Sequence, residues 1–177
     1  MIRFAIAALA LGLGALAAPA VAAEETPAGV LELRRNVGVW DTTTEFLAED
    51  GSVARAVRGT YSFEWVVSDS VLRGVSEIPE TKQKSAILFY YRAAKDEIEM
   101  VSVGADSVLW LMTGPGGGNA RTTAPRPTQD GGTITLRFTT ANVTAERFES
   151  RMEWSADEGQ IWNPGNRQTM VRRQPAG

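Results

Sequence analysis

Hydrophobic and polar residues alternate along most of the chain after residue 24, and a period of two is typical of strands that bury one face. The alternation is clearest at 57–65, 133–138 and 147–154. Shorter apolar segments bring the number of predicted strands to about nine. These segments lie at 38–47, 71–78, 85–92, 97–103, 107–113 and 168–173, and 119–124 is a candidate for one more.

The connections between these segments are too short for crossover helices, so we expect an antiparallel, meandering sheet. Gly38-Val39-Trp40 opens the first strand, and Arg172-Arg173 ends the last one. A glycine two residues before a tryptophan allows close backbone packing, while the indole fills the base of a small barrel and an arginine stacks across it. The predicted fold class is all-β, a single antiparallel meander β-barrel of about 8–10 strands.

Helical signals after residue 24 are confined to Thr26-Pro27, which predicts a cap followed by proline at the first helical position. A short N-terminal helical turn there would close one end of the barrel.

The first 23 residues have the pattern of a signal peptide. Arg3 gives a short positive region, Ala5 to Ala18 is an apolar run, and Ala20-Val21-Ala22 is a small-x-small cleavage pattern. The run is shorter than the roughly 20 residues that span a bilayer, so no membrane anchor is expected. We therefore predict a signal peptide at 1–23, a barrel domain at 24–177, and a periplasmic or secreted protein.

The amino-acid composition excludes several kinds of catalytic and metal-binding site. The chain has no cysteine and no histidine, which excludes disulfides, cysteine nucleophiles, imidazole bases, and histidine ligands for zinc or haem. The net charge of −3, without basic clusters, disfavours a nucleic-acid partner. We expect no metal, no cofactor and no assigned catalytic residue. The remaining acid-base and cationic candidates are Tyr61, Glu64, Arg73, Glu77, Tyr90, Tyr91 and Arg92.

One turn motif is specific. Residues 155–162 match S-x-D-x-G-x-x-W, the pattern of the Asp-box, and resemble the turns of sialidase-type propellers. In such a turn Asp157 accepts bonds from turn amides, Gly159 takes a conformation that other residues resist, and Trp162 packs beneath. A single copy predicts a structural hairpin only, because a propeller needs several blades.

Two features leave alternatives open. The glycine- and proline-rich segment 114–132 is either a lid over the barrel mouth or a mobile connection. Arg73 faces the cavity if Val71 and Val75 do, and faces solvent if Leu72 and Ile78 mark the inner side; Arg92 has the same ambiguity.

The segments 85–92 and 107–113 are apolar on both phases, although a barrel wall needs only one apolar face. The second face must be covered either by the N-terminal segment or by another subunit, and a homodimer is slightly favoured.

Together the Gly38 and Trp40 motif, the terminal arginine, the 65–74 segment and the 155–162 turn resemble the calycin superfamily of lipocalin and fatty-acid-binding barrels. The resemblance spans about residues 36–173 and is nearest to secreted bacterial lipocalin-like domains of unknown function. It implies a barrel that binds a small apolar ligand. Haem-binding members of that superfamily use a histidine that this chain lacks.

The predicted function is binding of a small hydrophobic or amphipathic, lipid-like ligand in the barrel. Two alternatives remain: an isomerase, cyclase or lyase that uses an inward carboxylate or tyrosine, and a solid-core interaction module that dimerises. The predicted ligand-binding residues are Phe46, Tyr61, Phe63, Trp65, Arg73, Phe89, Trp110, Phe138 and Phe148. The predicted structural residues are Gly38, Trp40, Asp157, Gly159, Trp162 and Arg172.

Overall fold

The structure, a computed structural model, describes residues 25–174, so the predicted signal peptide lies outside the described residues. One helix precedes the strands, α1 (Ala28–Asn36). The strands are β1 (Gly38–Leu47), β2 (Val53–Val67), β3 (Val71–Ile78), β4 (Gln83–Arg92), β5 (Glu97–Val103), β6 (Leu109–Pro115), β7 (Ala120–Thr123), β8 (Arg126–Pro127), β9 (Thr133–Ala141), β10 (Arg147–Ser155) and β11 (Asn163–Arg172). Two 3-10 turns, η1 (Pro79–Thr81) and η2 (Ala93–Lys95), join β3 to β4 and β4 to β5.

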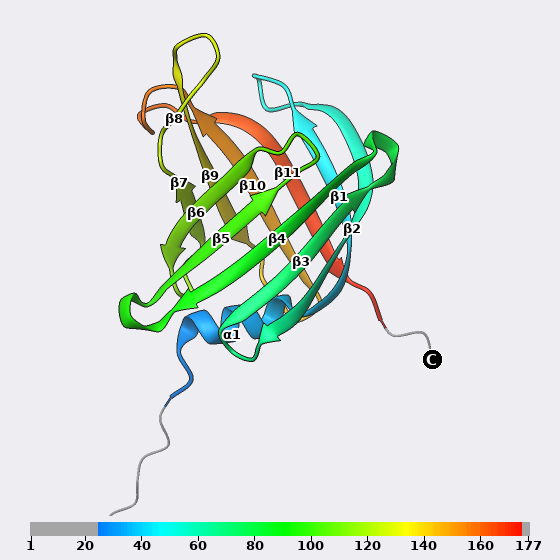
Figure 1. The fold of residues 1–177 in the computed structure, drawn as a ribbon. Helices are drawn as coiled ribbons and strands as arrows, with labels where there is room; N and C mark the ends of the chain where they lie inside the picture. Colours follow the sequence, from blue (N-terminus) through cyan, green and yellow to red (C-terminus); the bar gives the residue numbers. More distant parts are fainter. Residues whose placement is uncertain (1–24, 175–177) are drawn as a thin grey trace, which may run out of the picture.

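The strands form a closed antiparallel barrel of ten strands, which confirms the predicted fold class (Figure 1). The ring closes because β1 pairs with both β2 and β11, while β10 pairs with β9. Strand pairing in the ring is shortest between β6 and β7, which are joined by only two residue pairs. The two-residue β8 lies outside the ring and pairs with β9.

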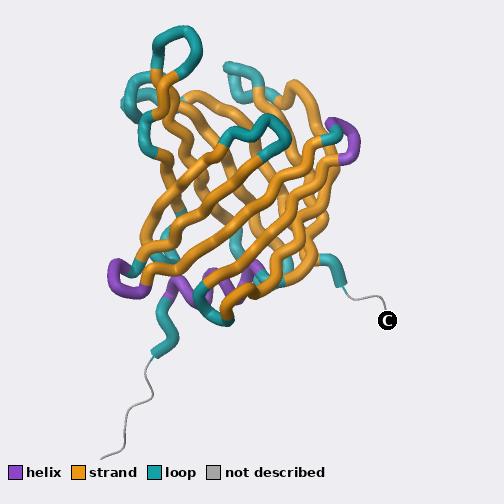
Figure 2. The backbone as a smooth tube through the Cα atoms, viewed as in Figure 1, coloured by secondary structure: helices purple, strands orange, loops and turns teal. Residues whose placement is uncertain are grey.

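Helix α1 lies across one end of the barrel (Figure 2). Its Val30 and Leu33 side chains join the buried cluster that contains Trp40, Leu72 and Ile98, so the helix supplies part of the core. The predicted cap differs in detail: Pro27 occupies the N-cap position, not the first helical position, and no side chain caps the helix start. None of the helices in residues 25–174 is long and apolar enough to span a bilayer.

The predicted strand positions agree closely with the structure at β1, β3 and β5. The largest difference is at β11, which begins at Asn163 and not at 168. Asn163, Pro164 and Gly165 show no hydrophobic alternation, so the pattern contains no signal for this part of the strand.

The segment 114–132 is neither a single lid nor an unstructured connection. Its first turn packs at the helix-closed end, where the Gly116 N–H donates to Asp96 O at 2.7 Å. The chain then forms β7 and β8 and makes a tight turn from Thr128 to Gly132. Only this second turn lies at the open end of the barrel, above β8 (Figure 1).

Candidate functional site

The barrel encloses a cavity of about 620 Å³. It extends from the helix-closed end, where Glu32, Arg35 and Asn36 line it, to the open end, where Gln83 and Asp106 line it. The walls come from alternate residues of the ring strands, because successive strand residues point to opposite faces. The cavity therefore has a floor formed by α1 and an open mouth.

Seven of the nine predicted ligand-binding residues line this cavity. They are Phe46, Tyr61, Phe63, Phe89, Trp110, Phe138 and Phe148. The strand register explains why these side chains converge. One row of paired, inward-facing residues runs across β2 to β6, in the order Phe63, Gly74, Ile87, Ser102 and Trp110. This row forms a belt of the cavity wall. Gly74 is needed in this belt, because a Cβ atom there would collide with the Phe63 ring.

Two of the nine lie elsewhere. Trp65 points inward but packs against the core cluster below the cavity. Arg73 lies on the outer face, 63% exposed, in an ion pair with Glu64. Assigning Arg73 to the cavity is thus wrong, because Leu72, Gly74, Ser76 and Ile78 form the buried phase of β3. Arg92 also lies on the outer face and pairs with Glu99.

Trp40 is fully buried beneath the cavity and does not line it. Its indole N–H donates to Asn36 O at 2.8 Å, and its ring meets Phe148 edge-on at 4.9 Å. The Arg172 guanidinium lies 4.2 Å from the Trp40 ring centroid. Gly38 has φ +122°, and a Cβ atom there would lie 2.7 Å from Arg172 Nη1, so both strain and space require glycine.

Arg172 also holds the end of α1. Its Nη1 donates to Val37 O at 2.6 Å and its Nη2 donates to Arg35 O at 2.7 Å. These carbonyls lie at the helix C-terminus, where intrahelical partners are lacking. Arg173 instead lies outside and pairs with Asp41. The sequence left open which of the two arginines stacks on the tryptophan, and the structure places Arg172 there.

The 155–162 turn joins β10 to β11 at the open end. Asp157 Oδ1 accepts from the Ser155 hydroxyl at 2.6 Å and from the Ile161 N–H at 2.8 Å. Gly159 has φ +93°, and a Cβ atom there would lie 3.2 Å from the Trp162 ring. The Arg137 guanidinium lies over the Trp162 ring, 4.1 Å from its centroid. These contacts hold the turn together. Asp157, Gly159 and Trp162, the three predicted structural residues of the turn, do not line the cavity.

The cavity floor carries three charged residues that the sequence analysis did not single out. Glu32 and Arg35 come from α1, and Arg121 comes from β7. Arg121 Nη2 donates to both carboxylate oxygens of Glu32, at 2.7 and 2.8 Å, and both side chains are less than a tenth exposed. The sequence contained little indication that these residues form part of a site, because Arg121 lies in the glycine- and proline-rich segment and Glu32 lies in a short helix.

The other chemical candidates are dispersed. Glu64 and Glu77 lie on the outer face, each in an ion pair with a neighbouring cation. Tyr61 faces the cavity, where its hydroxyl accepts a hydrogen bond from Gln168 Nε2 at 3.0 Å. Tyr91 lies at the closed end of the barrel. Its pKa is raised, mainly by burial and to a smaller extent by its hydrogen bond to Asp96. Within residues 25–174 no three acidic, histidine or cysteine residues gather as a metal site would require.

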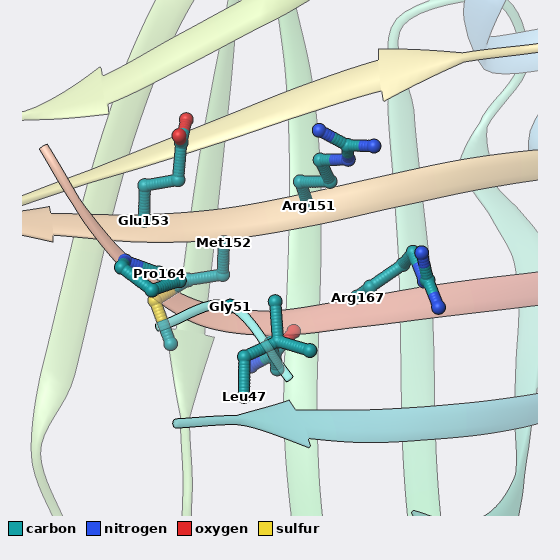
Figure 3. Close-up of a pocket in the computed structure, with 8 residues that line it drawn as sticks. Leu47, Gly51, Arg151, Met152, Glu153, Pro164 and Arg167 are labelled. Carbon is teal, nitrogen blue, oxygen red and sulfur yellow. The ribbon is translucent and has the colours of Figure 1, made fainter. Parts of the chain in front are cut away.

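A second hollow of about 200 Å³ adjoins the mouth (Figure 3). Arg151 and Glu153 lie on one side of β10 there, and Met152 lies on the other. Met152 and Asn166 line both hollows, so the smaller one is an extension of the open end. It is too small to enclose a ligand by itself.

No protein-family model matches the chain, and no curated protein matches it by sequence. Solved structures similar to it include the S-type phycobiliprotein lyase CPES from Guillardia theta, at 14% identity and a TM-score of 0.53, covering 82% of this chain and 93% of that chain. At this identity the likeness concerns the fold alone.

Two further solved structures have lower TM-scores. The redesigned beta barrel b11L5F_LGL has 11% identity and a TM-score of 0.44, covering 80% of this chain and 95% of that chain. The protein EF1p2_mFAP2b bound to DFHBI has 11% identity and a TM-score of 0.41, covering 83% of this chain and 99% of that chain.

Proposed function

We propose that this protein binds a small hydrophobic or amphipathic molecule inside its barrel, as the resemblance to calycin barrels implies. The observation that carries the proposal is the cavity of about 620 Å³ with an aromatic wall, a closed floor and one open mouth. Cavities of this size are typical of small-molecule sites. Aromatic side chains such as Phe89, Trp110 and Phe138 favour flat or acyl ligands.

Filling the cavity tests the proposal. Ser102 faces the interior beside Ile87 and Trp110, and Ser102→Phe would occupy ligand space. We expect binding of the neutral fluorescent probe N-phenyl-1-naphthylamine to weaken at least about tenfold, which is about 1.4 kcal/mol. Ser62→Phe is the matched control, because Ser62 is exposed on the outer face of β2, and it should leave the affinity unchanged.

Circular dichroism and melting of both variants check that the barrel is intact. Native mass spectrometry of protein purified gently from its host should also find a bound small molecule. Wild-type protein that binds neither the probe nor any host molecule would refute the proposal.

The geometry favours binding over catalysis. The cavity holds Tyr61 and the carboxylates of Glu32 and Asp106, but Glu32 is neutralised by Arg121 and Asp106 lies at the mouth. A general acid or base must reach the reacting group with a suitable pKa. Neither carboxylate is therefore an unpaired acid or base in the middle of the cavity. Turnover of extracted host metabolites by the purified protein would favour the enzymatic alternative.

A second role is supported by the outer face of β3 to β6. Outward residues in neighbouring rows form a continuous apolar surface, made of Val75, Ala86, Leu88, Tyr90, Val101, Val103, Leu109 and Leu111. Leu109 is 55% exposed and Leu111 44% exposed. Helix α1 packs below the barrel and does not cover this face. Exposed apolar surfaces of this kind mark interaction sites.

We propose that a second copy of the chain covers this surface. Ion pairs border it on three sides: Glu77 with Lys84, Glu64 with Arg73, and Glu99 with Arg92. Each border presents both charge signs, so a second copy related by a twofold axis would not bring borders of uniform like charge together. Light scattering during size exclusion should find a dimer for the wild type and for Ile161→Lys, and a monomer for Leu111→Lys. A monomeric wild-type protein would rule the dimer out.

We also propose export, from the leader pattern alone. N-terminal sequencing of the exported protein should then find Ala23 or Glu24 as the first residue.

A further inference from the structure

The charges on the cavity floor do not balance. Glu32 and Arg121 neutralise each other, and the Gly117 N–H donates to Glu32 Oε2 at 3.1 Å, so the carboxylate is fully engaged. Arg35 lies three residues after Glu32 on α1 and also lines the cavity. The floor therefore combines one closed ion pair with one additional positive charge.

Among the described residues 25–174, Arg35 has no partner for this charge. No carboxylate of residues 25–174 forms an ion pair with its guanidinium, and its Nε is buried without a hydrogen-bond partner. Burial lowers the pKa of the Arg35 guanidinium, the nearby Glu32 opposes this shift, and Arg121 adds to it. An arginine still stays charged in proteins, and Arg35 is half-buried, so part of its charge is withdrawn from water without a compensating partner.

The neighbouring arginine on the same helix shows the contrast. Arg34 points away from the barrel and forms a two-pronged ion pair with Asp69, at 2.8 and 2.7 Å. The exposed arginine is thus fully paired within residues 25–174, while the arginine that lines the cavity is not. This arrangement leaves a guanidinium prepared for an anion that arrives with the ligand.

We propose that Arg35 binds the anionic head group of the ligand, so that the ligand is an amphipathic anion with an apolar body and one carboxylate or a similar acid. This inference rests on the proposed binding function. The head group lies on the floor, and the apolar body extends along the walls formed by Phe63, Phe89 and Met112 toward the mouth. A guanidinium binds a carboxylate through two parallel hydrogen bonds, which fixes the orientation of the ligand.

The test compares two ligands that differ only at the head group, dodecanoate and 1-dodecanol, each displacing the neutral probe N-phenyl-1-naphthylamine. We expect wild-type protein to bind dodecanoate about tenfold to hundredfold more tightly than the alcohol. Arg35→Gln should remove this preference, because dodecanoate loses a charge-assisted interaction that the alcohol does not make. Arg34→Gln, the matched control on the outer side of α1, should keep the preference.

Equal affinity of the wild type for acid and alcohol would overturn the role of Arg35 while cavity binding stands. Retention of the full preference in Arg35→Gln would overturn it as well. Failure of the probe and of both ligands to bind any variant would instead refute the proposed function itself.

A measurement on the wild type alone covers the case in which Arg35→Gln does not fold. The carboxyl ¹³C signal of bound [1-¹³C]dodecanoate should titrate at lower pH than that of the free acid, because a paired guanidinium favours the ionised form. A bound carboxyl that titrates at the same or higher pH contradicts the proposal.

Discussion

Trp40 is a single residue that connects helix α1 to the barrel strands. Its ring contacts Phe148 from β10 and Arg172 from β11, and its N–H bonds to the last residue of α1. The side chain is fully buried, so its whole surface stabilises the closed end. Gly38 makes this packing possible, since its φ of +122° brings the chain from the helix into β1.

Trp40→Ala should lower the free energy of unfolding by about 3–5 kcal/mol, because truncation of a buried tryptophan loses transfer energy and leaves a cavity. Urea unfolding followed by circular dichroism measures the loss. Trp154→Ala is the control, because Trp154 is 36% exposed at the open end, and its loss should be clearly smaller. An unfolding midpoint unchanged in Trp40→Ala would mean that the indole does not support the barrel base.

The turn between β10 and β11 is held by its own short polar side chains. Ser155 is fully buried, and its hydroxyl donates to Asp157 while it accepts from the N–H groups of Asp157 and Gly159. The turn thus satisfies its own backbone groups through two short polar side chains. Arg137 connects the turn to β9 and β10, because it lies over Trp162 and pairs with Glu153 at 2.8 Å.

This turn should make the free energy of unfolding depend on pH in the acid range. The Ser155 hydroxyl and the Ile161 N–H hold the pKa of the Asp157 carboxyl below its usual value of 3.8. A carboxyl with a lowered pKa in the folded state stabilises the fold above its unfolded-state pKa, and this contribution is lost as the pH falls through the folded-state pKa.

We therefore expect Asp157→Asn to be less stable than the wild type at pH 7 and the difference to shrink as the pH falls below the unfolded-state pKa of Asp157. Urea unfolding across this pH range measures both proteins. Asn keeps one oxygen acceptor, and Oδ1 alone accepts both bonds of the turn, so the variant removes the charge and exchanges only the other carboxylate oxygen for an NH₂ group. A difference that is equally large at acid pH would show that the charge of Asp157 is not responsible.

At the scale of the whole molecule, the sequence predicted the barrel because most strands bury one face and expose the other. The inner phase of a strand is predictable only where its two faces differ in polarity. Arg73 was ambiguous because β3 has Val71 and Val75 on its outer phase beside the buried Leu72. The same outer apolar surface on β4 and β6 removes the contrast there.

The aromatic wall of the cavity was predictable for the same reason, and seven of the nine proposed residues line it. The helix that forms the floor was predictable, but its charged pairing with β7 was not. Glu32 and Arg121 are 89 residues apart and meet only because the ring closes and places β7 over α1. Local periodicity contains no information about such a pairing, and neither charge stands out in its own segment.

Closure of the ring has a consequence for how this protein meets other molecules. Every ring strand hydrogen-bonds to a neighbour on each side, so free backbone groups in the wall are confined to short stretches such as the start of β6, where β7 pairs with only two residues. A foreign strand therefore finds no full-length edge to which it could be added. Recognition of a macromolecule by the rest of the wall depends on side chains, which mutation can change without disturbing the scaffold.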